Sequence, residues 1–203
     1  MALAHTILAL LAKRPGSGYD ITKHFEEGLS CYWKATQQQV YRELSKLTKE
    51  KKVSFETLPQ AGKPDKKLYQ ITAAGWQELI RWYAEPTEPT DVREDVLVKI
   101  LIGYKMPREL VVKEISHRQA LHRAQLAFYR EKEAEHFQQQ KNAENNPSQL
   151  NPEDLERQFM YLTLKRGIAY ETSWLTWCDE VMAVLEQSEN LPTIEHFPDE
   201  PLK

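Results

Sequence analysis

Four hydrogen-bonding side chains recur at helical spacing in one segment of the chain: Gln38, Arg42, Ser45 and Lys49. At about 100° per residue they fall on one side of a helix, opposite an apolar stripe. A glutamine amide can bind adenine and an arginine guanidinium can bind guanine, each through two hydrogen bonds. This face has the chemistry of a helix that lies in the major groove of DNA. Polar residues on an outer helix face are also often only solvated, so the segment alone leaves both interpretations open.

Neighbouring side chains extend this predicted face. The apolar stripe opposite it consists of Val40, Leu44 and Leu47. Residues at the start of such a helix usually reach base edges, and Tyr41, offset to the side, suits a phosphate oxygen. The predicted DNA-contacting residues of the segment are Thr36, Gln37, Gln38, Gln39, Tyr41, Arg42, Ser45, Lys46 and Lys49.

A second basic group follows at a predicted hairpin tip. Residues 59–64 have turn chemistry, and Lys63, Lys66 and Lys67 lie around Gly62. Such lysines suit phosphate or minor-groove contacts, which position a protein on DNA without specifying sequence. Lysines at a strand edge can also serve only to prevent edge pairing between chains. The occurrence of both basic segments in this order favours DNA binding.

The surrounding residues predict the scaffold that holds these side chains. A first helix covers residues 3–12 and stops at Pro15-Gly16. Ser17 and Asp20 form a capping-box pattern that opens a second helix, and Thr36 is a good N-cap for a third that reaches about residue 51.

A ribbon of two strands and a fourth helix follow the third helix. Alternating residues mark the strands: Val53, Phe55 and Thr57 on the first, Tyr69 and Ile71 on the second. Thr72 can cap a helix over residues 73–84. Three helices followed by a ribbon with a basic tip form the winged-helix arrangement.

The rest of the chain is predicted to be helical. The segment 85–90 has two prolines and no apolar residue, so it is a linker or corner. A short helix near residues 96–101 precedes a long one from Pro107 to about residue 140, and Asn151-Pro152-Glu153-Asp154 starts the last. We predict a mainly α fold with a small β-wing. It comprises an N-terminal winged helix-turn-helix domain (1–85), a C-terminal helical, coiled-coil-like dimerisation domain (91–188) and an irregular tail (189–203).

The helices carry more apolar surface than so few of them can hide. We therefore predict a homodimer held by the first helix and by seams of the last part of the chain. The predicted dimer residues are Leu3, Ile7, Leu10, Leu155, Phe159, Leu162, Ile168, Leu175, Cys178, Met182 and Leu185.

Charge is divided unequally between the two parts. Residues 1–85 carry a net charge of +4 and residues 86–203 carry −7, which together give the −3 of the chain. A basic head on an acidic scaffold fits an anion-binding domain held by a part that does not touch DNA.

Enzymatic and membrane functions find no support in the sequence. The six histidines form no HExxH or other metal spacing, and we expect them to be scattered and solvated. We find no P-loop, no GxGxxG and no serine nucleophile motif, so we predict no catalytic residue, metal or cofactor. No apolar run approaches the roughly 20 residues that span a bilayer. Cys31 and Cys178 lie far apart, which fits a reducing cytoplasm.

Four motifs resemble those of the PadR-like transcriptional regulators. They are Ile7-Leu8-Ala9-Leu10-Leu11, Ser17-Gly18-Tyr19-Asp20-Ile21, Val40-Tyr41-Arg42-Glu43-Leu44-x-x-Leu47 and Tyr69-x-Ile71-Thr72-x-x-Gly75-x-x-x-Leu79. The second half resembles the long helical domain of the AphA-like virulence-activator branch, through its helix layout and a last helix with Trp174 and Trp177.

The resemblance implies an obligate dimer whose two winged helices bind a pseudo-palindromic promoter site. It also implies that Tyr19 and Tyr41 contact the DNA backbone. The chain departs from the family pattern at two places. Lys51-Lys52-Val53 stands where many relatives have a Gly-Leu or Gly-Ile turn, and Gln39 stands where small residues are frequent.

Two further possibilities remain open. Some relatives bind small aromatic effectors, and Trp33, Trp174 and Trp177 could line such a pocket, although tryptophans more often serve packing. The alternative function is a winged-helix protein-interaction adaptor without DNA binding. A lapsed DNA-binding protein should have lost Arg42 and the wing lysines, which this chain keeps.

Overall fold

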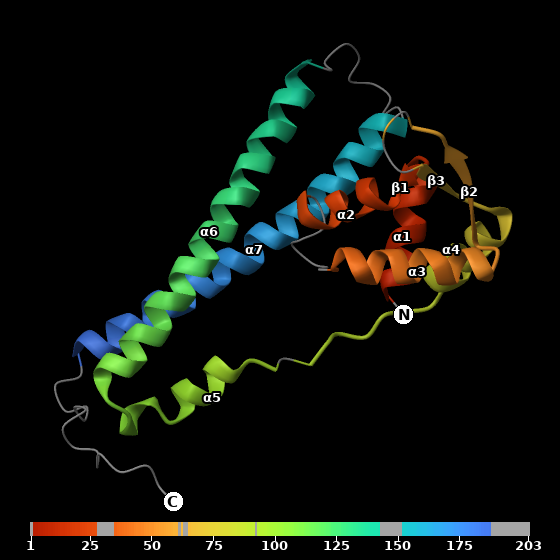
Figure 1. Ribbon diagram of the computed structural model, residues 1–203. Helices are drawn as coiled ribbons and strands as arrows, with labels where there is room; N and C mark the ends of the chain where they lie inside the picture. The colour runs from red at the N-terminus through yellow and green to blue at the C-terminus, as the bar shows by residue number, and fades with distance from the viewer. Residues whose placement is uncertain are drawn as a thin grey trace, which may run out of the picture. The chain divides into compact units, whose positions relative to one another are not determined.

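The computed structural model divides the chain into two units, residues 1–90 and 91–203 (Figure 1). It describes residues 2–27, 35–60, 62, 65–91, 93–142 and 152–187. Helices predominate, and a single small sheet lies in the N-terminal unit within these ranges.

The N-terminal unit has the predicted winged-helix order. Its elements are α1 (Ala2–Lys13), β1 (Gly16–Ser17), α2 (Gly18–Glu27), α3 (Gln37–Lys49), β2 (Val53–Leu58), β3 (Lys66–Ile71) and α4 (Ala73–Ala84). The predicted fold class is therefore confirmed. The short strand β1 was not predicted. It pairs antiparallel with β3, through Gly16 with Tyr69 and Ser17 with Leu68, so the sheet order is β1-β3-β2.

The core of this unit gathers one apolar face from each helix. Its buried members are the predicted stripe of α3 and residues of α1, α2 and the two long strands. They are Ile7, Leu8, Leu11, Ile21, Phe25, Val40, Leu44, Leu47, Val53 and Tyr69. Ile7 was predicted at the dimer surface, but its side chain is completely buried within its own chain. Leu3 and Leu10 are half-buried against the same core.

Side-chain caps begin three of the helices, as their sequences indicate. The Asp20 amide donates to Ser17 Oγ at 3.2 Å, and the Ser17 amide donates back to the Asp20 carboxylate at 2.9 Å. Thr36 caps α3 in the same reciprocal way with Gln39. Thr72 accepts from the Gly75 amide at 3.1 Å and so begins α4.

The turn after α3 keeps its left-handed geometry although no glycine occupies it. Lys51 has a φ of 58°. Its amide donates to the Thr48 carbonyl, and the Lys52 amide donates to the Leu47 carbonyl, which is the Schellman pattern. The Thr72 hydroxyl donates to the Lys51 carbonyl at 2.7 Å and holds the turn in place. The chain therefore forms this turn with Lys51 at the left-handed position instead of glycine.

The close approach of α4 to the turn after α3 requires a glycine at residue 75. A Cβ there would collide with the Lys52 carbonyl oxygen and lie 2.7 Å from the Ile71 side chain. The first turn of α4 can pass this close to the start of β2 only because residue 75 has no side chain.

Lys51→Gly is expected to stabilise the protein by roughly 0.5–1 kcal/mol, because a left-handed φ is costly for a residue with a Cβ. Thermal or urea unfolding would measure the change. Lys49→Gly, inside the last turn of the same helix, is the matched control and should destabilise by a similar amount. Equal destabilisation by both substitutions would contradict the strain assigned to Lys51.

The C-terminal unit is a long antiparallel helical hairpin with a short helix at one end (Figure 1). Its elements are α5 (Asp95–Leu101), the 3-10 turn η1 (Gly103–Lys105), α6 (Arg108–Asn142) and α7 (Pro152–Gln187). Contacts between α6 and α7 run in opposite directions along the two helices. Arg108 donates to the Leu185 carbonyl, Gln119 to Asp179, and Tyr161 to Glu133. The predicted tail 189–203 lies outside the described residues.

Polar pairs interrupt the apolar seam of the hairpin. His122 Nδ1 lies 2.5 Å from Glu171 Oε2, and the His122 ring stacks on Trp174 with a centroid distance of 5.2 Å. Both partners of the ion pair are largely buried. The expectation that the histidines are solvated is therefore wrong for His122, and it is also wrong for His5 in the N-terminal unit. Contacts between residues far apart in the sequence bury both rings.

The predicted dimer residues of α7 fall into three groups by burial. Ile168, Cys178 and Leu185 are buried within their own chain, and burial raises the pKa of the Cys178 thiol. Leu175 and Met182 are half-buried. Leu155, Phe159 and Leu162 are exposed. Only the exposed group lies freely on the surface of a single chain.

Candidate nucleic-acid interface

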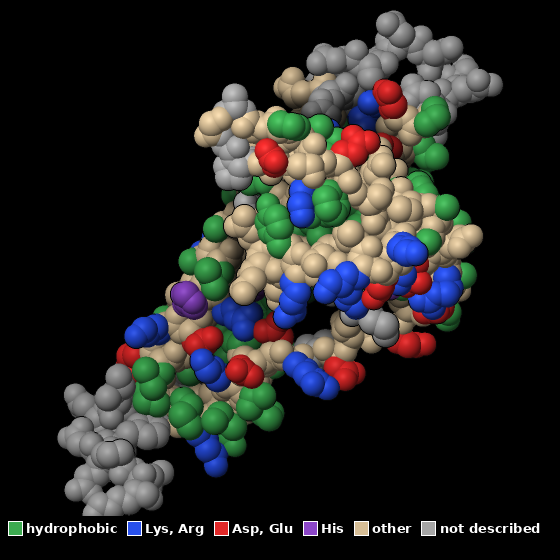
Figure 2. Space-filling model, turned by 45° about the vertical axis from the view of Figure 1, so that its right-hand side comes forward, with side chains coloured by type: hydrophobic (Ala, Val, Ile, Leu, Met, Phe, Trp, Pro, Cys, Tyr) green, Lys and Arg blue, Asp and Glu red, His purple; other side chains and the backbone are tan. Residues whose placement is uncertain are grey.

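The outer face of α3 presents a continuous row of polar side chains. Gln38, Arg42, Ser45 and Lys49 are all exposed. The opposite stripe of Val40, Leu44 and Leu47 is fully buried and fixes the rotation of the helix about its axis. On the face shown in Figure 2, lysine and arginine side chains gather in a band across the N-terminal unit, with acidic ones among them. The helix therefore offers donors, acceptors and positive charge on one side.

Two of the predicted contact residues also build the start of the helix. Gln39 Oε1 accepts from the Thr36 amide at 2.8 Å, while Thr36 Oγ1 accepts from the Gln39 amide at 3.3 Å. Gln37 is exposed beside them, and Lys46 lies 3.6 Å from Glu43. The side-chain carbonyl of Gln39 is engaged in the cap, which explains why a long amide suits a position where relatives often have small residues.

Tyr41 bridges α3 and the first turn of α2. A Cβ on Gly18 would lie 2.7 Å from the Tyr41 ring, so the absence of a side chain at residue 18 lets the ring pack there. Burial raises the pKa of the Tyr69 hydroxyl, and the nearby Tyr41 adds to the shift. Tyr19 is 65% exposed on the same turn of α2. Tyr19 of α2 and Tyr41 of α3 thus lie where the two helices meet.

The wing lysines are not equivalent. Lys66 Nζ lies 3.3 Å from the Asp20 carboxylate, so it ties the base of the wing to the start of α2. Lys67 Nζ lies 4.4 Å from the centroid of the Phe55 ring, across the ribbon. Lys63 lies outside the described residues. The sequence predicted one common role for the three lysines, but it gave no signal for the Asp20–Lys66 pair, which joins residues 46 positions apart.

The pair between Asp20 and Lys66 also orders the capping box. The Ser17 hydroxyl donates to the Asp20 carboxylate at 2.7 Å, and together with Lys66 it holds the pKa of Asp20 below its usual range. One carboxylate therefore contacts both the cap of α2 and the base of the ribbon.

Replacing Lys63 and Lys67 together by alanine is expected to weaken binding to all duplexes alike. The slope of log affinity against log salt should fall by roughly 0.9 for each phosphate that the variant no longer neutralises. Lys66→Ala serves as the comparison, because part of its charge is already neutralised by Asp20. An unchanged slope in the double variant would mean that the wing tip does not lie against the DNA.

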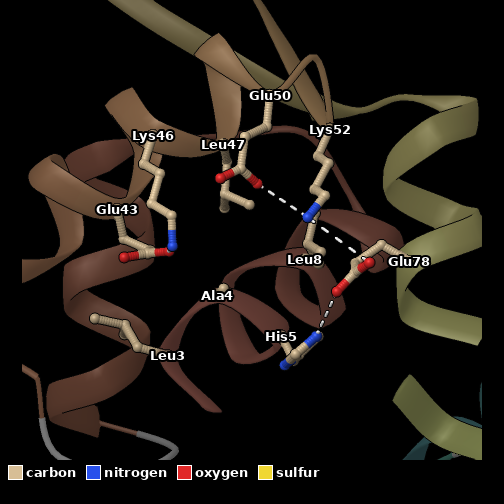
Figure 3. A pocket seen from close by; sticks show the side chains of 10 residues that line it. All are labelled: Leu3, Ala4, His5, Leu8, Glu43, Lys46, Leu47, Glu50, Lys52 and Glu78. Atoms are coloured by element: carbon tan, nitrogen blue, oxygen red, sulfur yellow. Dashed lines mark hydrogen bonds and ion pairs between the residues drawn. The ribbon is translucent and has the colours of Figure 1, made fainter. Parts of the chain in front are cut away.

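A pocket of about 230 Å³ lies behind α3, bounded by α1, the start of β2 and α4 (Figure 3). The charged side chains around it form a chain of ion pairs. Lys52 lies between Glu50 at 2.9 Å and Glu78 at 3.7 Å, and His5 Nε2 lies 3.0 Å from Glu78. The His5 ring stacks on Trp82 of α4. These contacts tie the C-terminal end of α3 to α1 and α4.

The stability of the N-terminal unit should depend on the charge of Glu78. Hydrogen bonds from Arg81 and His5 lower the pKa of Glu78 from 4.5 to about 2. Because the folded-state pKa is depressed, its contribution is complete above the unfolded-state value and is lost as the pH falls towards 2. Glu78→Gln should cost on the order of 1 kcal/mol at neutral pH, since water screens these pairs. It should also flatten the decline in unfolding free energy between about pH 5 and pH 2.

Urea unfolding at several pH values would measure this dependence. Glu88→Gln, in the segment after α4, removes the same charge and is the control. A Glu78→Gln curve parallel to that of the unaltered chain would show that the ion-pair network does not stabilise the fold.

Other predicted site residues lie elsewhere. Trp174 and Trp177 are half-buried against the core of the C-terminal unit, with ring centroids 5.3 Å apart, and Trp33 lies outside the described residues. Among the described residues, no group of three His, Cys, Asp or Glu side chains is placed to hold a metal ion. None of the helices in the described ranges is long and apolar enough to cross a membrane.

Comparisons with known proteins agree with this geometry. The family model described as "Transcriptional regulator PadR-like family" matches residues 7–81, and the model "Virulence activator alpha C-term" matches residues 92–186. The Mycobacterium tuberculosis protein named "Probable transcriptional regulator Rv1176c" is 34% identical over 200 residues, which cover 92% of this chain and 99% of that protein.

Solved structures of members of this family are also similar to the chain over most of its length. The Vibrio cholerae virulence activator AphA is 31% identical, with a TM-score of 0.71 over 91% of this chain and 98% of its own. Bacillus subtilis PadR in complex with operator DNA is 29% identical, with a TM-score of 0.70 over 91% and 99%. PadR in complex with p-coumaric acid is 27% identical, with a TM-score of 0.68 over 92% and 96%.

The M. tuberculosis relative is named a probable transcriptional regulator, and the matching family model describes transcriptional regulators and not enzymes. The similarity to AphA and PadR covers both units. Together with the winged helix, the match shows that the chain belongs to the PadR-like family of transcriptional regulators, with a C-terminal domain of the virulence-activator type.

Proposed function

We propose that the protein binds a pseudo-palindromic promoter site as a homodimer and regulates transcription from it. The observation that carries this proposal is the polar, exposed face of α3 opposite its fully buried stripe. The complex of B. subtilis PadR with operator DNA supports the same use of the fold. A DNA-binding role places the protein in the cytoplasm, with the DNA.

Each residue of the face has a chemical role in this proposal. Arg42 binds a guanine and Gln38 an adenine, each through paired hydrogen bonds in the major groove. Lys49 and the wing lysine Lys67 contact phosphates, as do Tyr19 and Tyr41 from the side. A second protomer places the same residues one helical turn away, about 34–36 Å along the DNA.

The C-terminal unit supplies the dimer. Its acidic balance, set by the −7 of residues 86–203, would repel phosphate, so it does not serve as a DNA contact. Its exposed apolar side chains, among them Phe159 and Leu162, instead suit association with a second chain.

Selection of bound duplexes from random DNA by the purified full-length protein tests the proposal. Two inverted half-sites, with centres about 10–10.5 base pairs apart or a multiple of that, are expected to be enriched. Absence of any enriched motif would favour the alternative of a protein-interaction adaptor without DNA binding. The exposed Arg42 argues against that alternative, because an adaptor has no use for a base-reading guanidinium on this face.

We further propose that a small aromatic effector modulates DNA binding. The support is the complex of B. subtilis PadR with p-coumaric acid. Titration with phenolic acids, followed by tryptophan fluorescence and by release of the selected DNA, tests this. A set of phenolic acids that changes neither signal would contradict it.

A further inference from the structure

The fold orients the side-chain amide of Gln39, the third residue of α3. The amide oxygen of Gln39 accepts hydrogen bonds from the Thr36 backbone amide at 2.8 Å and from the Thr36 hydroxyl at 3.2 Å. A backbone N–H can only donate, so the atom that faces Thr36 must be the side-chain oxygen of Gln39 and not its nitrogen. The capping box therefore fixes which end of this amide points back into the chain.

Gln38, the preceding residue, has no such restraint. Its side chain is exposed, and within the described part of the chain it makes no hydrogen bond. A free glutamine amide offers one acceptor oxygen and two N–H donors. Because the oxygen of Gln39 is engaged in the cap, Gln39 offers outward only its two N–H donors. Two neighbouring residues of the same type therefore differ in the hydrogen bonds that they can make to DNA.

Gln39 lies where a helix in the major groove reaches the bases. It is exposed in the first turn of α3 and precedes Arg42 by three residues. At about 100° per residue, the two side chains lie roughly 60° apart around the helix and therefore on the same side. Residues in the N-terminal part of a recognition helix are the ones that contact base edges. The donors of Gln39 therefore lie beside the guanidinium of Arg42, at the end of α3 that enters the groove.

The major-groove edges of the purine bases differ in what they offer to such donors. Guanine presents two acceptors, N7 and O6, whereas adenine presents the N7 acceptor beside the N6 amino donor. A group with donors alone can pair with both atoms of guanine. Against adenine it leaves donors facing one another without partners, which is costly once water is excluded. Phosphate oxygens also accept such donors, but the exposed ammonium groups of Lys49 and Lys67 form stronger, charge-assisted bonds to phosphate.

We propose that Gln39 is a specificity-determining residue, which donates to a guanine in each half-site and excludes adenine there because Thr36 holds its oxygen. One side chain thus both caps α3 and recognises a base. Gln38, whose amide is free, keeps the capacity to bind adenine. This inference rests on the DNA binding of the proposed function and assigns one further base to one residue.

Selection of duplexes from random DNA by three full-length proteins tests this assignment: the native chain, Gln39→Glu and Gln37→Glu. A glutamate at residue 39 keeps an acceptor for the cap, since Glu is a usual partner in capping boxes, but it has no N–H donor. Gln37→Glu adds the same charge in the same exposed turn and is the matched control. The native chain and Gln37→Glu should enrich a guanine in each half-site that Gln39→Glu no longer enriches. Neither variant should unfold at a lower temperature than the native chain, because both keep the cap.

A change of one atom in the DNA gives an independent measurement. Replacing that guanine by 7-deazaguanine in both half-sites removes the N7 acceptor. It should weaken binding of the native chain about 10-fold and that of Gln39→Glu less than about twofold. A guanine that Gln39→Glu still enriches, or an affinity that this variant loses equally for all sequences, would overturn the assignment and leave the DNA-binding function standing. A native chain that enriches no motif would refute the DNA-binding function and this inference with it.

Discussion

Arg42→Ala is expected to lower affinity for the selected operator at least 10-fold while leaving affinity for random duplexes nearly unchanged. A guanidinium that binds guanine through two bonds contributes about 1–3 kcal/mol of discrimination, and a dimer has one such guanidinium in each half-site. Arg42 is exposed opposite the buried stripe of α3, so its removal should not disturb the fold. Competition gel shifts with operator and random DNA at one salt concentration would measure the ratio.

Two variants separate base recognition from charge. Arg42→Lys keeps the charge but loses the paired geometry, so it should be nearly as unselective as Arg42→Ala. Arg93→Ala removes an exposed arginine outside α3 and is the control for net charge. An Arg42→Ala protein that remains as selective as the native one would show that α3 does not place this residue at a base.

Residues 1–90 alone are expected to bind the operator 10²- to 10⁴-fold more weakly than the full chain. The N-terminal unit has its own core, with Phe25 and Leu44 fully buried, so the loss should come from separation of the two heads and not from unfolding. Linked heads gain effective concentration that a single head lacks. DNA titration of both proteins at one salt concentration, with sedimentation of each, would measure it.

Two further measurements distinguish loss of the linked second head from unfolding of the fragment. Circular dichroism of the fragment should show helix in proportion to its length, and its affinity for a single half-site should match that of one head in the full chain. A folded fragment with undiminished operator affinity would contradict the role given to the C-terminal unit.

Local patterns in the sequence were sufficient to predict the helices of the winged helix and their rotation. Val40, Leu44 and Leu47 repeat with the period of a helix, and their burial follows from that period. Caps are equally local, because Ser17 and Asp20, or Thr36 and Gln39, contact one another within one turn. The motifs of residues 7–79 were therefore sufficient to indicate the family, because each motif consists of residues that contact one another within one or two helical turns or along one strand.

The tertiary structure alone decided which residues meet across long sequence separations. Nothing local indicated that Gly16 and Ser17 form a strand beside β3, since two residues carry no period. The sequence places Lys66 in the wing, and only the structure shows that it forms an ion pair with Asp20.

The periodicity of apolar residues also could not predict whether an apolar stripe is covered by its own chain or by a partner. Ile7 and Cys178 belong to apolar stripes, as predicted, but a stripe does not state whether its own chain or a partner covers it. In the structure both side chains are buried within their own chain, whereas Leu101 and Phe159 are exposed. A pattern along one helix determines which face is apolar, and only the positions of the other helices determine which part of that face remains on the surface.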